Sequence, residues 1–258
     1  WRGQGFMHLN TTYAPTVDGT LLLEHPLQAF RDGGQAKVPL LLGTNSDEAS
    51  FSKLFYMRNS ARSRAALRLL SAFDSVEAHR VLDAYAGAYE RGQFAELLAD
   101  ALFWAPSVRL ATDHNLQAPT WMYRFDYAPA ALRWLGLGAM HSLELSSIFG
   151  DPGASRTSGI TRFGGMEGMA ELTDRMQYHW GQFIHHGRPG VEWPPYGPPS
   201  DTIPARATMV FDDPPHVEYD PKDGQRRAWA YYDMTEWGNG VPELLEQLGL
   251  MISTELGR

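Results

Sequence analysis

Residues 38–48 read Val-Pro-Leu-Leu-Leu-Gly-Thr-Asn-Ser-Asp-Glu, and this stretch decides how the rest of the chain is interpreted. Its first half is a short, continuous apolar run, which is typical of a strand buried on both faces of a sheet. Its second half ends in two carboxylates. A carboxylate just past such a strand lies at the C-terminal edge of the sheet, where α/β proteins bind their ligands. Asp47 and Glu48 are therefore candidate catalytic acids.

The same segment has a second interpretation, as the start of a helix. Asn45 and Glu48 have the spacing of a capping box, in which two residues satisfy each other's backbone N–H groups. Asp47 is then a first-turn charge that the helix dipole favours. Taken alone, this segment favours capping over catalysis, so the decision needs evidence from elsewhere in the chain.

A second stretch, Gly-Ala-Met-His-Ser-Leu-Glu-Leu at residues 138–145, places His141 in a loop flanked by Gly136 and Gly138. Histidine is the usual proton carrier at neutral pH. The alternative is a loop histidine with an ordinary hydrogen bond, one of nine histidines in the chain. The acid precedes the histidine, and each follows a strand-like run. A serine nucleophile would be expected before both, yet no Gly-x-Ser-x-Gly occurs in these residues.

The surrounding pattern predicts an α/β protein with a mostly parallel sheet flanked by helices, because strand-like and helix-like segments alternate. Residues at about 60–117 form a helical insertion or cap, with breaks expected at Asp74 and Gly92. The other expected elements are a helix opened by His25-Pro26, a strand at 120–127, a helix at 169–184, two edge strands at 207–212 and 216–220, and a last helix at 242–256.

Composition excludes several classes of function. The 258 residues carry a net charge of −8, which argues against nucleic acid and anionic membrane surfaces as partners. No apolar stretch approaches the ~20 residues of a membrane span. The chain has no cysteine, hence no disulfide and no thiolate chemistry, and its compartment stays open. His185-His186 lacks a third ligand at metal-binding spacing, so no metal site is expected.

Five segments in order resemble a known family, the type-B carboxylesterases, which are cholinesterase-like α/β-hydrolases that include bacterial para-nitrobenzyl esterases. The resemblance covers nearly the whole chain. It is carried by residues 15–19 with 25–26, by 38–48, by 123–126, by 141–145 with 149–150, and by 180–183 with 187–189, 193–194 and 196.

The resemblance implies roles for four residues. Glu48 takes the place of the triad acid, in preference to Asp47, and His141 takes the place of the general base. Phe51 falls where the family has an aromatic residue lining the active site, although ordinary core packing explains it equally well. Glu144 matches a family carboxylate that supports the site without taking part in the chemistry. A metal or organic cofactor is not implied.

The resemblance also implies that residues 1–258 are the C-terminal portion of one α/β-hydrolase domain. The nucleophilic serine and the oxyanion hole would lie in an N-terminal segment of the same protein, and the substrate would be a small-molecule ester. The chain departs from the family at Ala49 and Ser142, where glycine is usual, which bears on loop shape and pocket size.

Two other interpretations remain at this stage. The first is a non-catalytic cholinesterase-like domain that serves adhesion or scaffolding, because a fold does not fix a function. The second is an unrelated α/β domain in which Glu48 and His141 are structural. The presence of both residues favours the enzyme, and the ordered run of segments argues against an unrelated domain.

Overall fold

The computed structural model describes residues 17–54, 58–150, 166–198 and 205–236. The chain divides into two compact units. One, here called the sheet unit, comprises Gln35–Phe51 and Ala99–Asp223, and the other, the helical unit, comprises Trp1–Gly34, Ser52–Leu98 and Gly224–Arg258.

The sheet unit is built on a four-stranded sheet with the strand order β1-β2-β3-β4. The first three strands run parallel and β4 is antiparallel to β3, so the prediction of a mostly parallel sheet is confirmed for the described residues. The register pairs Leu40 with Thr120 and Asn45 with Phe125. The elements of this unit are β1 (Leu40–Asn45), the π-helix η3 (Asp100–Trp104), α5 (Ala105–His114), β2 (Thr120–Phe125), α6 (Ala130–Trp134), α7 (Leu145–Ile148), α9 (Met166–His186), β3 (Ala207–Phe211) and β4 (His216–Tyr219).

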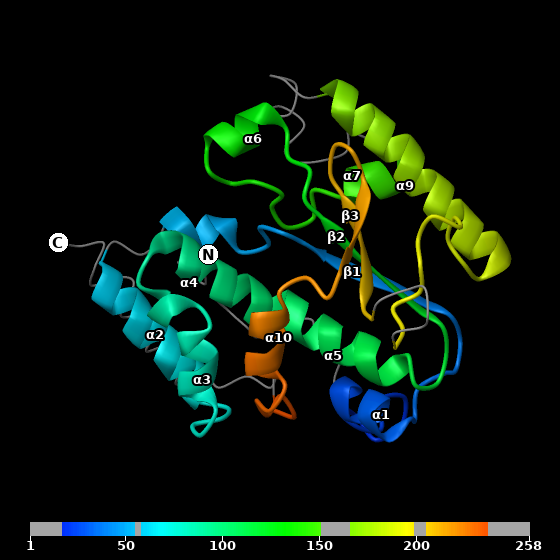
Figure 1. Ribbon diagram of the computed structural model, residues 1–258. Coiled ribbons are helices and arrows are strands. Elements are labelled where there is room, and N and C mark those ends of the chain that lie inside the picture. Colours follow the sequence, from blue (N-terminus) through cyan, green and yellow to red (C-terminus); the bar gives the residue numbers. More distant parts are fainter. Residues whose placement is uncertain (1–16, 55–57, 151–165, 199–204, 237–258) are drawn as a thin grey trace. The chain divides into compact units, whose positions relative to one another are not determined.

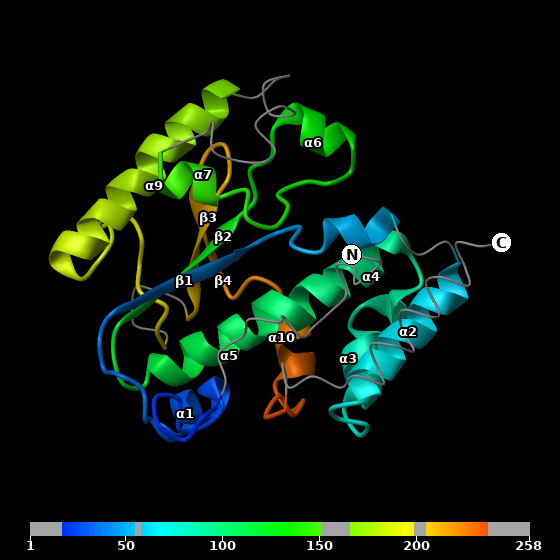
Figure 2. The same cartoon turned by 180° about the vertical axis from the view of Figure 1, so that it is seen from behind.

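Helices cover both faces of this sheet. In Figures 1 and 2, α9 lies on one side of the strands and α5 lies on the other. Because side chains alternate along a strand, Trp121, Tyr123 and Phe125 share one face of β2. They form a core cluster with apolar residues of α9, among them Met176. Aromatic rings close this core, with Trp193 packed edge-on against Phe211 at 5.5 Å between ring centroids.

The structure corrects two strand predictions. The strand expected from Val38 begins at Leu40, and its first four residues are half-buried rather than buried on both faces, because β2 is its only neighbour within the described residues. The second correction concerns β3, which is not an edge strand: it is buried along its length and lies between β2 and β4. An apolar run indicates a strand but does not reveal how many neighbours it has.

The helical unit contains α1 (Pro26–Asp32), α2 (Asn59–Ser71), α3 (Ala78–Asp83), the 3-10 turn η2 (Ala86–Ala88), α4 (Arg91–Ala99), which ends at the unit's boundary, and α10 (Asp223–Trp229). The short 3-10 helix η1 (Ser50–Leu54) joins the two units. As expected, His25-Pro26 opens α1: the His25 Nδ1 accepts the Leu27 N–H at 3.3 Å. Two buried hydrogen bonds attach residues 229–232 to the helical unit. The Tyr232 hydroxyl donates to the Leu70 carbonyl at 2.6 Å, and Trp229 Nε1 donates to the Tyr85 hydroxyl at 2.8 Å.

The helical block at about 60–117 is helical but differs in two ways from the prediction. The expected break at Gly92 is wrong, because Gly92 lies inside α4. The interruption instead falls at Ala86, Gly87 and Ala88, all of which have positive φ. The block is also not one insertion, because α5 packs on β1 and β2 as part of the sheet unit. The helix expected at 242–256 lies outside the described residues.

Candidate functional site

The two predicted site segments meet at the C-terminal ends of neighbouring parallel strands. Residues 46–48 follow β1, and the loop that carries His141 follows β2 after α6. An isolated parallel bridge joins Asp47 to Met140, and the Asp47 N–H donates to the Ala139 carbonyl at 3.1 Å. Backbone hydrogen bonding therefore fixes the acid segment against the histidine loop before any side chain is considered.

Glu48 and His141 form a short hydrogen bond, with 2.6 Å between Oε2 and Nδ1. Glu48 is buried, whereas about half of the His141 side chain is exposed. Since an ionised carboxylate only accepts hydrogen bonds, Nδ1 carries the proton and Nε2 is the acceptor in the neutral ring. The hydrogen bond to Glu48 raises the pKa of His141, and partial burial opposes that rise. A histidine oriented this way can accept a proton at Nε2.

The structure reconciles the two interpretations of the acid segment. Glu48 Oε1 accepts the backbone N–H of Asn45 at 2.8 Å, which is one half of a capping box. The other half is absent, because the Asn45 side chain bonds the Met140 carbonyl and Glu144 instead. No helix begins here, because Asn45 ends β1 and η1 begins only at Ser50, so Glu48 bonds the Asn45 N–H with one oxygen and His141 with the other. Asp47 lies against the Ala139 N–H at 3.3 Å, where its carboxylate supports the loop backbone.

Glu144 is linked to the site through Asn45, and its supporting role there stays a prediction. Its Oε2 accepts a hydrogen bond from Asn45 Nδ2 at 2.6 Å. Burial raises the pKa of Glu144, and the Asn45 hydrogen bond opposes that rise. Burial beside Glu144 and Glu48 also raises the pKa of Tyr123, which keeps that phenol neutral.

Two phenylalanines concern this site, Phe51 as a predicted pocket residue and Phe103 through its contact with His141. Phe51 packs against the core cluster of the sheet unit, as the packing alternative expected, and its place in a substrate pocket stays a prediction. The Phe103 ring lies 4.8 Å from the His141 ring, tilted by 35°. Phe103 belongs to the π-helix η3, a widened helical turn that no periodic pattern in the sequence indicates. No motif in the sequence indicates a role for Phe103.

The departure at Ser142 has a geometric meaning. Ser142 has a φ of +65°, a left-handed conformation that glycine adopts without strain. The family's usual glycine fits this backbone, and Ser142 occupies it at some cost. Ala49, the other departure, is buried and is not among the residues with positive φ.

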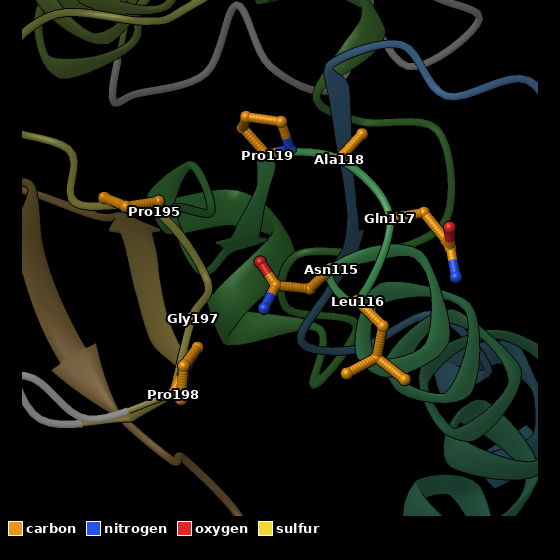
Figure 3. A pocket seen from close by; sticks show the side chains of 8 residues that line it. All are labelled: Asn115, Leu116, Gln117, Ala118, Pro119, Pro195, Gly197 and Pro198. Carbon is orange, nitrogen blue, oxygen red and sulfur yellow. The ribbon is translucent and has the colours of Figure 1, made fainter.

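A hollow in the sheet unit lies away from Glu48 and His141, at the beginning of β2 rather than at its end (Figure 3). It is lined by uncharged residues, namely Asn115, Leu116, Gln117, Ala118, Pro119, Pro195, Gly197 and Pro198. Metal-binding groups of three or more histidine or acidic residues are absent from the described part of the chain. Of the helices in that same part, none has the length and apolarity to cross a membrane.

A mostly parallel sheet that brings an acid and a histidine together beyond adjacent strand ends is the arrangement of α/β-hydrolases, and this chain has that fold. The model of the carboxylesterase family matches residues 4–214, so the chain belongs to the carboxylesterase family.

The names of similar proteins agree with this family. The para-nitrobenzyl esterase of Bacillus subtilis is 30% identical over 223 residues, which cover 83% of this chain and 42% of that protein. Carboxylesterase 1E of Mus musculus is 29% identical over 211 residues, covering 73% of this chain and 36% of that protein. A solved PNB esterase structure gives a TM-score of 0.67 at 28% identity, over 86% of this chain and 44% of the other. The chain thus spans less than half the length of these relatives.

Proposed function

We propose that this chain supplies the acid and the base of a Ser–Glu–His triad in an enzyme that hydrolyses carboxylic esters. In this proposal residues 1–258 are the C-terminal half of one catalytic domain, and an N-terminal segment of the same protein supplies the serine and the oxyanion hole. The observation that carries the proposal is the 2.6 Å hydrogen bond between Glu48 and His141 in a chain of the carboxylesterase family.

Each residue has a defined part in the proposed reaction. His141 Nε2 removes the proton of the serine hydroxyl as the serine attacks the ester carbonyl, and Glu48 stabilises the imidazolium that forms. His141 then protonates the leaving alcohol, which yields an acyl-enzyme. Water deprotonated by the same imidazole hydrolyses the acyl-enzyme and restores the serine. This sequence is complete with the three side chains and two oxyanion donors.

The names of the relatives indicate the substrate class. They include a para-nitrobenzyl esterase, several carboxylesterases and an acylcarnitine hydrolase. Each of these names denotes an enzyme that cleaves esters. A small-molecule carboxylic ester is therefore the substrate to test first. A non-catalytic adhesion or scaffolding role is the alternative. A hydrogen-bonded Glu48–His141 pair whose imidazole side chain is about half exposed favours the enzyme, because a scaffold has no need of that geometry.

The deciding experiment replaces His141 by alanine in the complete protein, meaning this chain together with its N-terminal segment. Loss of the base costs about 10⁶-fold in kcat in subtilisin, the standard case, and we expect a loss of comparable size here. His186→Ala is the matched control, because His186 is an exposed histidine at the end of α9 and should keep full activity. Near-normal ester hydrolysis by a folded His141→Ala protein would favour the scaffold.

A second experiment tests the proposed division of the protein. We expect residues 1–258, purified alone, to lack esterase activity, because the nucleophile and both oxyanion donors would be missing. The edge of β1 that pairs with no strand among the described residues would also be prone to aggregation. A soluble monomer that unfolds cooperatively and hydrolyses short-chain esters would refute this division while leaving the roles of Glu48 and His141 to the first experiment.

A further inference from the structure

Asn45 hydrogen-bonds both to Glu48 and to the loop that carries His141. Its backbone N–H donates to Glu48 Oε1 at 2.8 Å. Its side-chain Nδ2 donates to the Met140 carbonyl at 2.7 Å and to Glu144 Oε2 at 2.6 Å. Met140 directly precedes His141, and Glu144 follows it by three residues. The Asn45 side chain therefore hydrogen-bonds the histidine loop on both sides of His141.

We propose that Asn45 is a positioning residue, whose side-chain amide holds the histidine loop in place so that His141 meets the carboxylate of Glu48. This inference rests on the proposed function, and it concerns the residue that sets the geometry rather than the residues that carry out the reaction.

The chemistry of the site requires an amide at this position. The amide nitrogen of asparagine carries two hydrogens, and here each faces an acceptor, one neutral and one acidic. Those two acceptors also determine the orientation of the amide, since the opposite orientation would place its oxygen against two other oxygens. A hydroxyl offers one hydrogen, and a carboxylate offers none.

The oxygen of this amide indicates that stability alone does not explain the residue. Asn45 is 4% exposed, and its Oδ1 has no hydrogen-bond partner within the described part of the chain. A buried polar atom without a partner destabilises the fold. An apolar residue at the end of β1 would avoid this cost, but Glu144 would lose the Asn45 donor and the Met140 carbonyl would keep only the Leu143 N–H, at 3.1 Å.

The amide also influences the charges around His141. The titratable groups that face this imidazole and its supporting residues are Glu48, Glu144, Asp47 and Tyr123. The hydrogen bond from Asn45 counteracts the rise in the pKa of Glu144 that burial causes, and the negative charge on Glu144 in turn raises the pKa of His141. Loss of the amide should therefore favour neutral Glu144 and lower the pKa of His141.

The structure separates the two functions of Asn45, which makes a clean test feasible. Replacing the side chain leaves the backbone N–H that bonds Glu48, so Asn45→Ala removes only the side-chain hydrogen bonds to the histidine loop. Asn45→Asp has the same shape, lacks both N–H donors and adds a negative charge. Thr44→Val is the matched control, because Thr44 is the adjacent buried residue of β1 and its side chain points to the opposite face.

The experiment measures ester hydrolysis by the complete protein as a function of pH, together with the downfield Nδ1–H resonance of His141 in protein labelled with ¹⁵N-histidine. His141→Ala assigns that resonance. For Asn45→Ala we expect kcat to fall about 10- to 100-fold with KM little changed, because small misplacements of reacting groups have effects of this size. We also expect the resonance to move upfield or broaden, and the ascending limb of kcat/KM to move to lower pH.

The charge variant gives the opposite shift in pH. For Asn45→Asp we expect a similar loss of kcat, but its added carboxylate should raise the pKa of His141 and move the limb to higher pH. Thr44→Val should leave the rate, the limb and the resonance unchanged. If Asn45→Ala does not fold, the isosteric Asn45→Asp protein supplies the rate and the resonance instead.

The outcomes distinguish this inference from the proposed function. Unchanged rates and an unchanged His141 resonance in folded Asn45 variants would overturn the positioning role even if the protein is an esterase. If the wild-type protein hydrolyses no ester, the proposed function fails, yet the resonance still reports whether Asn45 holds the Glu48–His141 hydrogen bond. A loss of folding stability with the resonance intact would assign Asn45 to structure alone and would also refute the inference.

Discussion

Adding one methyl group at Gly43 should loosen both the sheet and the site. Gly43 lies in β1 opposite Tyr123 of β2. A Cβ at this position would lie closer than 3.0 Å to the ring and to the backbone carbonyl oxygen of Tyr123. A ring can rotate aside, but a carbonyl oxygen in a strand cannot, so β1 and β2 must separate. Overpacking of this kind costs about 1–3 kcal/mol, and we expect Gly43→Ala to reach the upper end because backbone moves.

Separation of the strands should also affect catalysis, since Glu48 follows β1 and the loop carrying His141 follows β2. Urea unfolding of the complete protein measures the free energy of unfolding, and ester hydrolysis by the folded fraction measures the geometry of the pair. Gly181→Ala is the control, because a Cβ on Gly181 in α9 would meet no heavy atom within 4 Å. It should stabilise the helix by about 0.5–1 kcal/mol. A Gly43→Ala protein as stable and active as the wild type would refute the reasoning.

Three further predictions follow from individual contacts. The hydrogen bond to Glu48 raises the pKa of His141, so the rise of kcat/KM with pH should have its midpoint above the usual histidine pKa of ~6.5. Glu48→Gln removes that carboxylate and should move the midpoint to lower pH, as a pH–rate profile would show. Ser142→Gly should relieve a left-handed backbone and raise stability by up to about 1 kcal/mol in a thermal melt, whereas a decrease would contradict the strain. Lys222→Met removes the cation that contacts buried Asp100 at 2.6 Å and should cost about 3 kcal/mol in urea unfolding; a change under about 0.5 kcal/mol would show that the pair contributes little.

The pairing of Glu48 with His141 could be expected from the sequence because it depends on a general property of parallel sheets. Strands that run in the same direction present their C-terminal ends at one edge, so residues that follow two such strands converge. The sequence did not show that the two strands are neighbours, which the register of β1 with β2 establishes.

The parts that could not be predicted depend on contacts between segments far apart in the chain. The sequence predicts a helix cap at Asn45, because only local spacing can be seen in a sequence. In the structure the Asn45 side chain donates to the carbonyl of Met140, 95 residues later in the chain. Phe103 reaches His141 through a π-helix, whose extra residue per turn breaks the helical period. Gly138 indicates a loop in the sequence. The structure shows why this residue is glycine, because a Cβ here would lie closer than 3.0 Å to the side chain of Asp47.

The Glu48–His141 pair lies entirely within the sheet unit, and main-chain contacts bring its two segments together. The parallel bridge from Asp47 to Met140 and the N–H of Asn45 set the positions of both partners, and neither requires a particular side chain at the bridge. Side chains then adjust the pair: Asn45 fixes the loop, and the ring of Phe103 lies over the imidazole. Loop residues such as Ser142 can therefore vary, at some cost in strain, without separating Glu48 from His141. In the proposed enzyme, such a variable loop can change the space around Nε2, and hence which ester His141 acts on.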